Sequence, residues 1–182
     1  MSSLSVTRPE RDTSRHSPDP IRIESASSAD WRELSELENA SFRGDRISGR
    51  SWRALLASNA ATVTVAREST ATRQASAIVG ATVVLQRAGT SVARLYSIAL
   101  APRARGRGVS TALLEDATQR MRDAGAAVLR LETRLDNTAA QRLFSRSGFV
   151  QRGRKPAYYE DGMDAVLYQK SLSKFVVISK EH

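Results

Sequence analysis

The sequence predicts an α/β fold built as one domain, and three observations carry that prediction. The chain has 182 residues, of which 41% are hydrophobic, enough for one sizeable core. Segments with helical spacing of apolar residues alternate with short runs typical of strands. Aromatic residues make up only 5% of the chain, so Ala, Val, Leu and Ile must supply most of the core. We place the domain at 21–172, between a Ser-, Arg- and Pro-rich segment 1–20 expected to be disordered and a tail at 173–182.

The first half of the domain is predicted to contain a short strand, two helices and three further strands. Residues 21–24 alternate as a strand does. Ser28 or Asp30 can cap a helix that continues to about residue 42, and a second helix follows around Trp52. The tryptophans of these helices, Trp31 and Trp52, are expected to pack in the core. Strands follow at 62–66, 77–86 and 92–100, with a polar hairpin loop at 68–76.

The second half alternates helices and strands more regularly. A helix over 109–124 is expected to end at Gly125, because glycine commonly ends helices in the left-handed conformation. Asn137 is expected to cap a helix over 138–146, since asparagine is a favoured N-cap residue. Strands are predicted at 127–133, from Phe149 onward, and at 165–170.

Composition excludes several kinds of chemistry. The chain has no cysteine, which excludes disulfides, thiolate metal sites and a cysteine nucleophile. Its two histidines, His16 and His182, lie near the ends, so neither a histidine triad nor a metal site is expected. The N-terminus has no apolar signal region, and no apolar run approaches the ~20 residues of a membrane span. We therefore expect a soluble, cytoplasmic protein without a membrane partner.

The net charge of +9 predicts an anionic partner, and one segment indicates where it binds. A strand ending at Leu100 runs through Ala101 and Pro102 into a loop rich in Arg and Gly that opens a helix. Glycines let the backbone approach a ligand closely, and a helix N-terminus presents N–H groups and a positive dipole to a pyrophosphate. An ordinary strand–helix turn with solvated arginines is the other interpretation. The residues concerned are Arg103, Arg105, Gly106, Arg107, Gly108, Val109, Ser110 and Thr111.

This segment resembles the first signature of the GCN5-related N-acetyltransferase (GNAT) superfamily, Gln/Arg-x-x-Gly-x-Gly/Ala. Arg103 to Gly108 satisfies the pattern fully, whereas the ungapped register starting at Arg105 places Ser110 at the last small position. Residues 131–149 resemble the second signature, a strand followed by Asn-x-x-Ala and a helix that ends in Gly-Phe. Residues 158–165 resemble the closing hairpin of the ribosomal-protein alanine and protein N-terminal acetyltransferase branch. The resemblance implies a mixed, mostly antiparallel sheet that is splayed at the strand before the Gly/Arg loop.

The resemblance also implies acetyl-CoA as co-substrate and an amine as acceptor. Glu132 matches the general base of the ribosomal alanine branch; alternatively, it is a strand carboxylate paired with Arg130 two residues away. Tyr158 and Tyr159 match the hairpin that lines the acceptor site; alternatively, they form a cross-strand aromatic pair. Phe144 occupies the position at which the family usually has a tyrosine general acid. Phenylalanine cannot donate a proton, so a hairpin tyrosine or a water takes that role, or catalysis is weak or lost.

The resemblance assigns the remaining contacts to the coenzyme. The backbone of Ile98, Ala99 and Leu100 is expected to line the pantetheine arm, with Asn137 and the helix position of Phe144 beside it. Asn137 can serve both as a helix cap and as a coenzyme ligand.

Four functions remain to be weighed. The leading one is acetyl transfer from acetyl-CoA to a protein or peptide N-terminal amine. Acetylation of a small amine or antibiotic is the enzyme alternative, and region 29–58 with the last hairpin would decide between them. A coenzyme-binding domain that has lost catalysis is suggested by Phe144. A nucleic-acid-binding module is argued against by the scarce aromatics and the lack of a helix-turn-helix or RNP-like motif.

Overall fold

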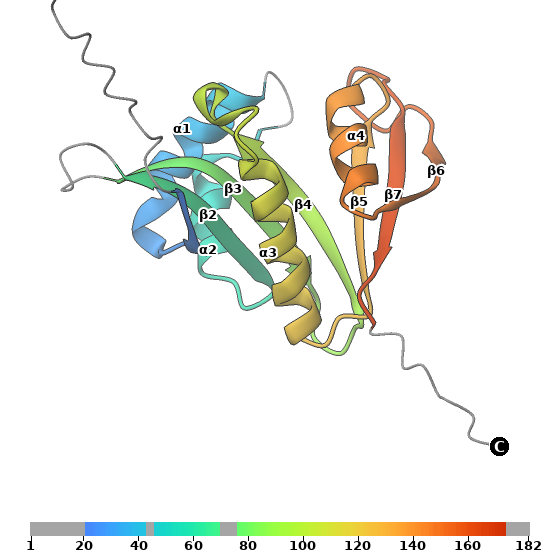
Figure 1. The fold of residues 1–182 in the computed structure, drawn as a ribbon, viewed down its shortest axis with the longest axis horizontal. Helices are drawn as coiled ribbons and strands as arrows, with labels where there is room; N and C mark the ends of the chain where they lie inside the picture. Colours follow the sequence, from blue (N-terminus) through green and yellow to red (C-terminus); the bar gives the residue numbers. More distant parts are fainter. Residues whose placement is uncertain (1–20, 43–45, 70–75, 174–182) are drawn as a thin grey trace, which may run out of the picture.

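The computed structural model describes residues 21–42, 46–69 and 76–173, so the expected tails at 1–20 and 173–182 lie outside the described residues, apart from Ser173. Figure 1 shows a twisted sheet with helices on its faces, which confirms the predicted fold class. The strands are β1 (Ile21–Ser25), β2 (Ala61–Ser69), β3 (Ser76–Gln86), β4 (Val92–Leu100), β5 (Val128–Arg134), β6 (Val150–Lys155) and β7 (Ala165–Ser171). The helices are α1 (Trp31–Ser41), α2 (Gly49–Leu56), α3 (Val109–Asp123) and α4 (Thr138–Arg146), with 3-10 turns at Ser28–Asp30 and Pro102–Ala104.

The seven strands form one sheet in the order β1-β2-β3-β4-β5-β7-β6. All neighbours are antiparallel except β4 and β5. These two parallel strands pair only at their beginnings, through Val92–Val128, Ala93–Leu129 and Arg94–Arg130. Beyond Arg94 the strands diverge, as Figure 1 shows, so the sheet is splayed where the sequence predicts.

Local sequence explains where the functional helices begin. Asn137 caps α4, because its side-chain oxygen accepts a hydrogen bond from the Ala140 N–H at 3.1 Å. Gly108 precedes α3 with a φ of 77°, a left-handed conformation that glycine adopts without steric cost. The predicted hairpin loop begins later than expected, because β2 continues through Glu68 to Ser69. Glu68 is therefore part of strand β2.

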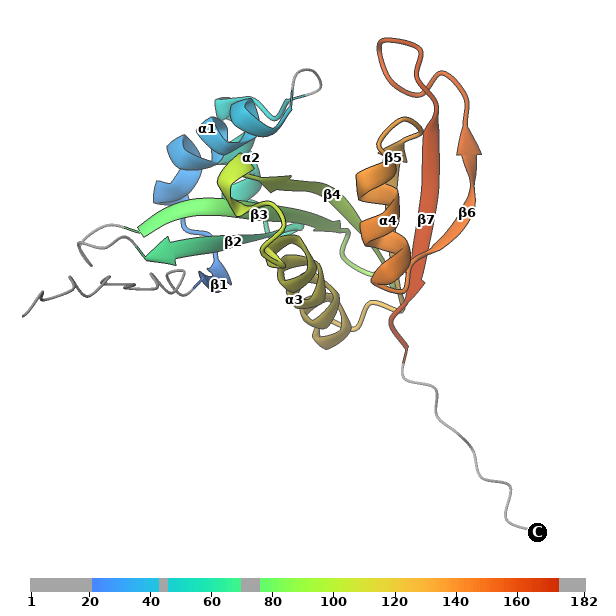
Figure 2. The same ribbon diagram turned by 45° about the horizontal axis from the view of Figure 1, so that its top comes forward.

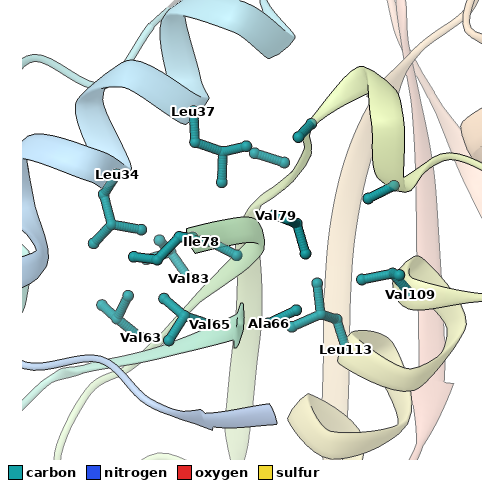
Figure 3. Close-up of a cluster of buried hydrophobic side chains, with 14 of the residues drawn as sticks. Leu34, Leu37, Val63, Val65, Ala66, Ile78, Val79, Val83, Val109 and Leu113 are labelled. Carbon is teal, nitrogen blue, oxygen red and sulfur yellow. The ribbon is translucent and has the colours of Figure 1, made fainter. Parts of the chain in front are cut away.

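The core consists of two clusters on either side of the splay. In the first, drawn in Figure 3, Leu34 and Leu37 of α1 and Leu113 of α3 pack with valines of β2 and β3. In the second, Leu114 and Ala117 of α3 pack with residues of β4, β5, α4 and β7. Figure 2 shows α1 and α2 on one side of β2–β4 and α3 on the other. Helix α3 therefore contributes to both halves of the molecule.

The two tryptophans differ in burial. Trp52 is 1% exposed and belongs to the first cluster, as predicted. Trp31 is only partly buried and packs at the edge of that cluster. Its ring lies 4.7 Å from the Arg32 guanidinium carbon and 4.6 Å from that of Arg53. Trp31 is thus a residue at the boundary of the core that makes two cation–π contacts, rather than a core residue.

A buried carboxylate lies in the first half. Glu38 of α1 is 2% exposed; Oε1 accepts a hydrogen bond from the Ile47 N–H at 3.0 Å. Its Oε2 has no hydrogen-bond partner among the described residues. Burial raises the pKa of the Glu38 carboxyl, because the charged form loses its hydration, although the Ile47 N–H partly counters this.

This burial predicts a pH-dependent stability effect of Glu38→Gln. Glu38 is protonated in both states at pH values below the ordinary glutamate pKa, and its ionisation disfavours the fold as pH rises through the raised pKa. Gln keeps the acceptor for Ile47 without the charge. We expect the Tm of the variant relative to the wild type to rise by a few °C between about pH 4 and pH 8. Thermal unfolding at both pH values checks this; Glu36→Gln, at an exposed position of α1, should show no such trend.

No helix in the described ranges is both long and apolar enough to cross a membrane.

Candidate active site

The Gly/Arg loop lies between the end of β4 and the start of α3. Gly106 and Gly108 have φ values of 72° and 77°, and a Cβ added at either would meet nothing within 4 Å. The glycines are therefore required by backbone conformation rather than by crowding within the chain. Val109 of the first turn of α3 is buried, whereas Ser110 is half-buried and Thr111 exposed. The N-cap residue of α3, Gly108, makes no side-chain cap hydrogen bond, so no cap from it occupies the first N–H groups that an anion site requires.

The loop arginines have an acidic neighbour that local pattern did not reveal. Glu68 of β2 accepts from Arg107 NH1 at 2.5 Å and lies 3.5 Å from Arg103 Nε. Arg105 is exposed and forms no ion pair with the described residues. The loop is positively charged, but Glu68 already neutralises part of that charge. Glu68 lies 39 residues from Arg107 along the chain, so no local sequence pattern indicates this ion pair.

Removing this carboxylate is expected to strengthen coenzyme binding. In Glu68→Gln, Arg103 and Arg107 no longer share their charge with the protein and can turn to a pyrophosphate. Since a surface ion pair contributes about 0.2–1 kcal/mol, we expect the Kd for CoA to fall by roughly 1.4- to fivefold. Calorimetric titration at low and high salt measures this, and the gain should shrink at high salt. Weaker binding in the variant would mean that Glu68 orients the arginines instead of competing for them.

The strand leading to the loop has one edge without a paired strand among the described residues beyond Arg94, although the Leu100 carbonyl accepts a hydrogen bond from the Ser41 hydroxyl at 3.1 Å. Ile98, Ala99 and Leu100 of β4 pair with β3 on one side, opposite Thr82, Ala81 and Gly80. On the other side, β5 has already diverged. The side chain of Ala99 is buried, and those of Ile98 and Leu100 are half-buried. Their side chains thus belong to the core, as expected, while the backbone edge toward β5 lies at the splay.

Helix α4 borders the other side of the splay. The cap role of Asn137 is established by its bond to Ala140, and its contact with a coenzyme stays a prediction. Phe144 is 3% exposed, with ring-centroid distances of 5.9 Å to Phe149 and 6.0 Å to Tyr168. Phe144 therefore fills the second core cluster, and its role beside the coenzyme also stays a prediction.

Glu132 and Tyr158 meet at the splay through a third residue, Arg94. Arg94 Nε donates to Glu132 Oε2 at 2.8 Å, and its NH2 group donates to the Tyr158 hydroxyl at 3.0 Å. The side chain of Glu132 is 17% exposed and that of Arg94 42%. The alternative interpretation, in which Glu132 pairs with Arg130, is wrong, because Arg130 Nε instead donates to Gln169 of β7 at 3.2 Å.

The cluster faces away from α3. Leu95 and Leu131 alternate with Arg94 and Glu132 along β4 and β5 and pack in the cluster that includes α3. Because successive strand residues point to opposite faces, Arg94 and Glu132 project from the other face. The Gly/Arg loop follows the far end of β4, whereas the Glu132 carboxylate lies just beyond the last residue pair that joins β4 to β5. A long substrate in the splay could reach both.

Partial burial lowers the pKa of Arg94, but the hydrogen bond and charge of Glu132, with those of Tyr158, outweigh it. The net result is a pKa above the ordinary arginine value, so Arg94 stays charged.

The hairpin between β6 and β7 is fastened to β5 by Arg134. This residue lies 2.7 Å from Asp161 of the hairpin and 3.1 Å from Asp136, and its guanidinium carbon is 5.0 Å from the centre of the Tyr159 ring. Tyr158 and Tyr159 meet edge to face with centroids 5.2 Å apart. The two tyrosines therefore contact each other as chain neighbours in the loop between β6 and β7, so the alternative of a cross-strand pair is wrong.

Comparisons with known proteins agree with this geometry. The statistical model of the acetyltransferase (GNAT) family matches residues 31–149. N-alpha-acetyltransferase 30 of Schizosaccharomyces pombe is 37% identical over 71 residues, 39% of this chain and 47% of that protein. The chain thus spans about half the length of this curated relative.

Two solved structures share the fold. The ribosomal-protein-S18-alanine N-acetyltransferase of Escherichia coli has a TM-score of 0.73 at 22% identity, covering 85% of this chain and 96% of that one. The NatC complex bound to Gag peptide and CoA has a TM-score of 0.69 at 20% identity, covering 84% and 99%. The family match spans well over half of the chain and includes the loop, Asn137 and Phe144. This chain belongs to the acetyltransferase (GNAT) family.

Proposed function

We propose that this enzyme transfers the acetyl group of acetyl-CoA to the N-terminal α-amine of a protein or peptide. The observation that carries the proposal is the carboxylate of Glu132, half-buried at the splay and hydrogen-bonded within a cluster that includes Tyr158. Acetyl transfer to an amine needs a proton acceptor beside the amine and a proton donor beside the leaving sulfur.

The coenzyme side of the splay fits a pyrophosphate. The uncapped first turn of α3, the left-handed glycines and Arg105 supply N–H donors and positive charge. The open edge of β4 at Ile98 to Leu100 supplies backbone groups for an amide-bearing arm. When bound, acetyl-CoA supplies the activated thioester. The NatC complex bound to Gag peptide and CoA has the same fold and supports this assignment.

The proposed reaction needs two proton transfers, one to Glu132 and one from Tyr158. Glu132 accepts a proton from the attacking amine while the new N–C bond forms. The C–S bond breaks, and Tyr158 donates its hydroxyl proton to the sulfur. The proton on Glu132 then returns through solvent to the Tyr158 oxygen, so the enzyme ends in its initial state. Phe144 takes no part, because it has no proton to give.

The α-amine is the favoured acceptor on chemical grounds. Its ordinary pKa of about 7.7–8.0 leaves a substantial neutral fraction near neutral pH, whereas a lysine amine near ~10.4 needs much stronger deprotonation. A single carboxylate such as Glu132 suits the former. The S18-alanine acetyltransferase and the N-alpha-acetyltransferase relative point to the same acceptor class.

A thiol-release assay tests the proposal against a panel of peptides with free N-termini, matched N-blocked peptides containing lysine, and small amines including an antibiotic. The chain has no cysteine of its own, so released CoA is the only thiol expected. Turnover confined to free N-termini supports the proposal. Turnover confined to small amines, or CoA binding without turnover on any acceptor, would contradict it.

A further inference from the structure

The guanidinium of Arg94 joins three segments that the sequence keeps far apart. Glu132 follows it by 38 residues and Tyr158 by 64, and both accept hydrogen bonds from it. Its guanidinium carbon also lies 5.7 Å from the centre of the Tyr96 ring on the same strand. Arg94 sits in the last residue pair before β4 and β5 diverge, opposite Arg130. It therefore holds a fixed place at the narrow end of the splay.

The two hydrogen bonds determine which atoms of Glu132 and Tyr158 remain free to accept or donate a proton. Nε occupies only one of the carboxylate oxygens, Oε2, so Glu132 keeps lone pairs on Oε1 for a further proton. The Tyr158 oxygen accepts from Arg94, so its own hydrogen must point elsewhere as a donor. A charged guanidinium beside that oxygen also stabilises the negative charge that forms when the proton leaves.

We infer that Arg94 is a positioning residue for acetyl transfer: it orients Glu132 as proton acceptor and Tyr158 as proton donor at the splay. The inference rests on the proposed function and deepens it. It assigns the role of proton donor to Tyr158, because α4 carries Phe144, which has no proton to donate. The planar fork of arginine matters, because Nε and NH2 reach two partners at once in a fixed geometry that a lysine ammonium does not reproduce.

The test compares Arg94→Gln and Arg94→Lys with Arg130→Gln as matched control. Arg130 lies opposite Arg94 on the same face and bonds to Gln169, away from Glu132 and Tyr158. We expect Arg94→Gln to lower kcat by about 10²-fold, with the Kd for CoA within about twofold of the wild-type value. Arg94→Lys should recover less than about a tenth of the lost rate, because it keeps the charge but not the fork. Arg130→Gln should stay near the wild type.

Two further measurements isolate positioning from general damage. The double variant Arg94→Gln/Tyr158→Phe should be little slower than Arg94→Gln alone, since coupled residues do not contribute additively. Amide hydrogen exchange of residues 156–164 should be faster in Arg94→Gln than in the wild type and in Arg130→Gln, because the hairpin loses its bond to β4.

Failure of the inference is distinguishable from failure of the proposed function. If Glu132→Gln abolishes turnover while Arg94→Gln stays within about twofold of the wild type, or if Arg94→Lys restores the full rate, the role of Arg94 is overturned and the function stands. If the wild type turns over no acceptor, the proposed function is overturned. The role of Arg94 in acetyl transfer is then overturned with it, and hydrogen exchange reports only whether the contact of Arg94 with Tyr158 holds the hairpin.

Discussion

Glu132→Gln is expected to lower kcat by about 10²- to 10⁴-fold, the usual contribution of a positioned general base. The amide is almost the same size as the carboxylate and can still accept the bond from Arg94 Nε, which spans 2.8 Å in the wild type. It cannot take a proton from the amine at neutral pH. Steady-state thiol release with the best peptide acceptor measures the loss.

Coenzyme binding should survive this change, because Glu132 faces away from α3 and the Gly/Arg loop. A calorimetric Kd for CoA within about twofold of the wild type would separate lost chemistry from lost binding. Glu115→Gln, at an exposed position of α3, provides the matched control. If Glu132→Gln retained more than about a tenth of wild-type kcat, another group or water would have to act as the general base.

Trp52→Ala is expected to cause the largest loss of stability. Trp52 is 1% exposed in the first cluster with Leu34 and Leu37, and truncating a buried aromatic to alanine typically costs about 3–5 kcal/mol. For a domain of this length that corresponds to a fall in Tm of roughly 10 °C or more. Chemical denaturation followed by circular dichroism measures the free energy of unfolding.

The variants Trp52→Phe and Trp31→Ala provide comparisons for the loss of stability in Trp52→Ala. The indole N–H of Trp52 has no hydrogen-bond partner among the described residues, so Trp52→Phe removes a poorly satisfied donor and should cost much less than alanine. Trp31→Ala removes the other tryptophan, which lies at the boundary of the cluster and contacts Arg53. A loss at Trp31 equal to that at Trp52 would contradict the difference in burial.

The sequence predicted those parts of the site that local chemistry dictates. The Gly/Arg loop, the cap at Asn137 and the buried strand before the loop each follow from residue type and spacing over a short segment. The structure places the two glycines in the left-handed region and Asn137 on the Ala140 N–H. The splay was implied by the family resemblance, and the short β4–β5 pairing confirms it.

The partners of the charged residues could not be predicted in the same way. Spacing along the strand offers Arg130 as an alternative partner of Glu132, because residues two apart share a strand face, but Glu132 pairs with Arg94 of the neighbouring strand. Glu68 reaches the loop because antiparallel β2 and β3 extend beyond the apolar run that marks them. Such contacts depend on strand register across the sheet, which no local pattern encodes.

The position of α3 has a consequence for how the molecule unfolds. Three residue pairs join β4 to β5, which alone would leave two loosely connected halves. However, Leu113 packs with the first half and the adjacent Leu114 with the second, so one helix is part of both cores. Neither half can open without removing apolar partners from α3. We therefore expect a single cooperative unit in native-state exchange, with no fragment ending within α3 folding independently.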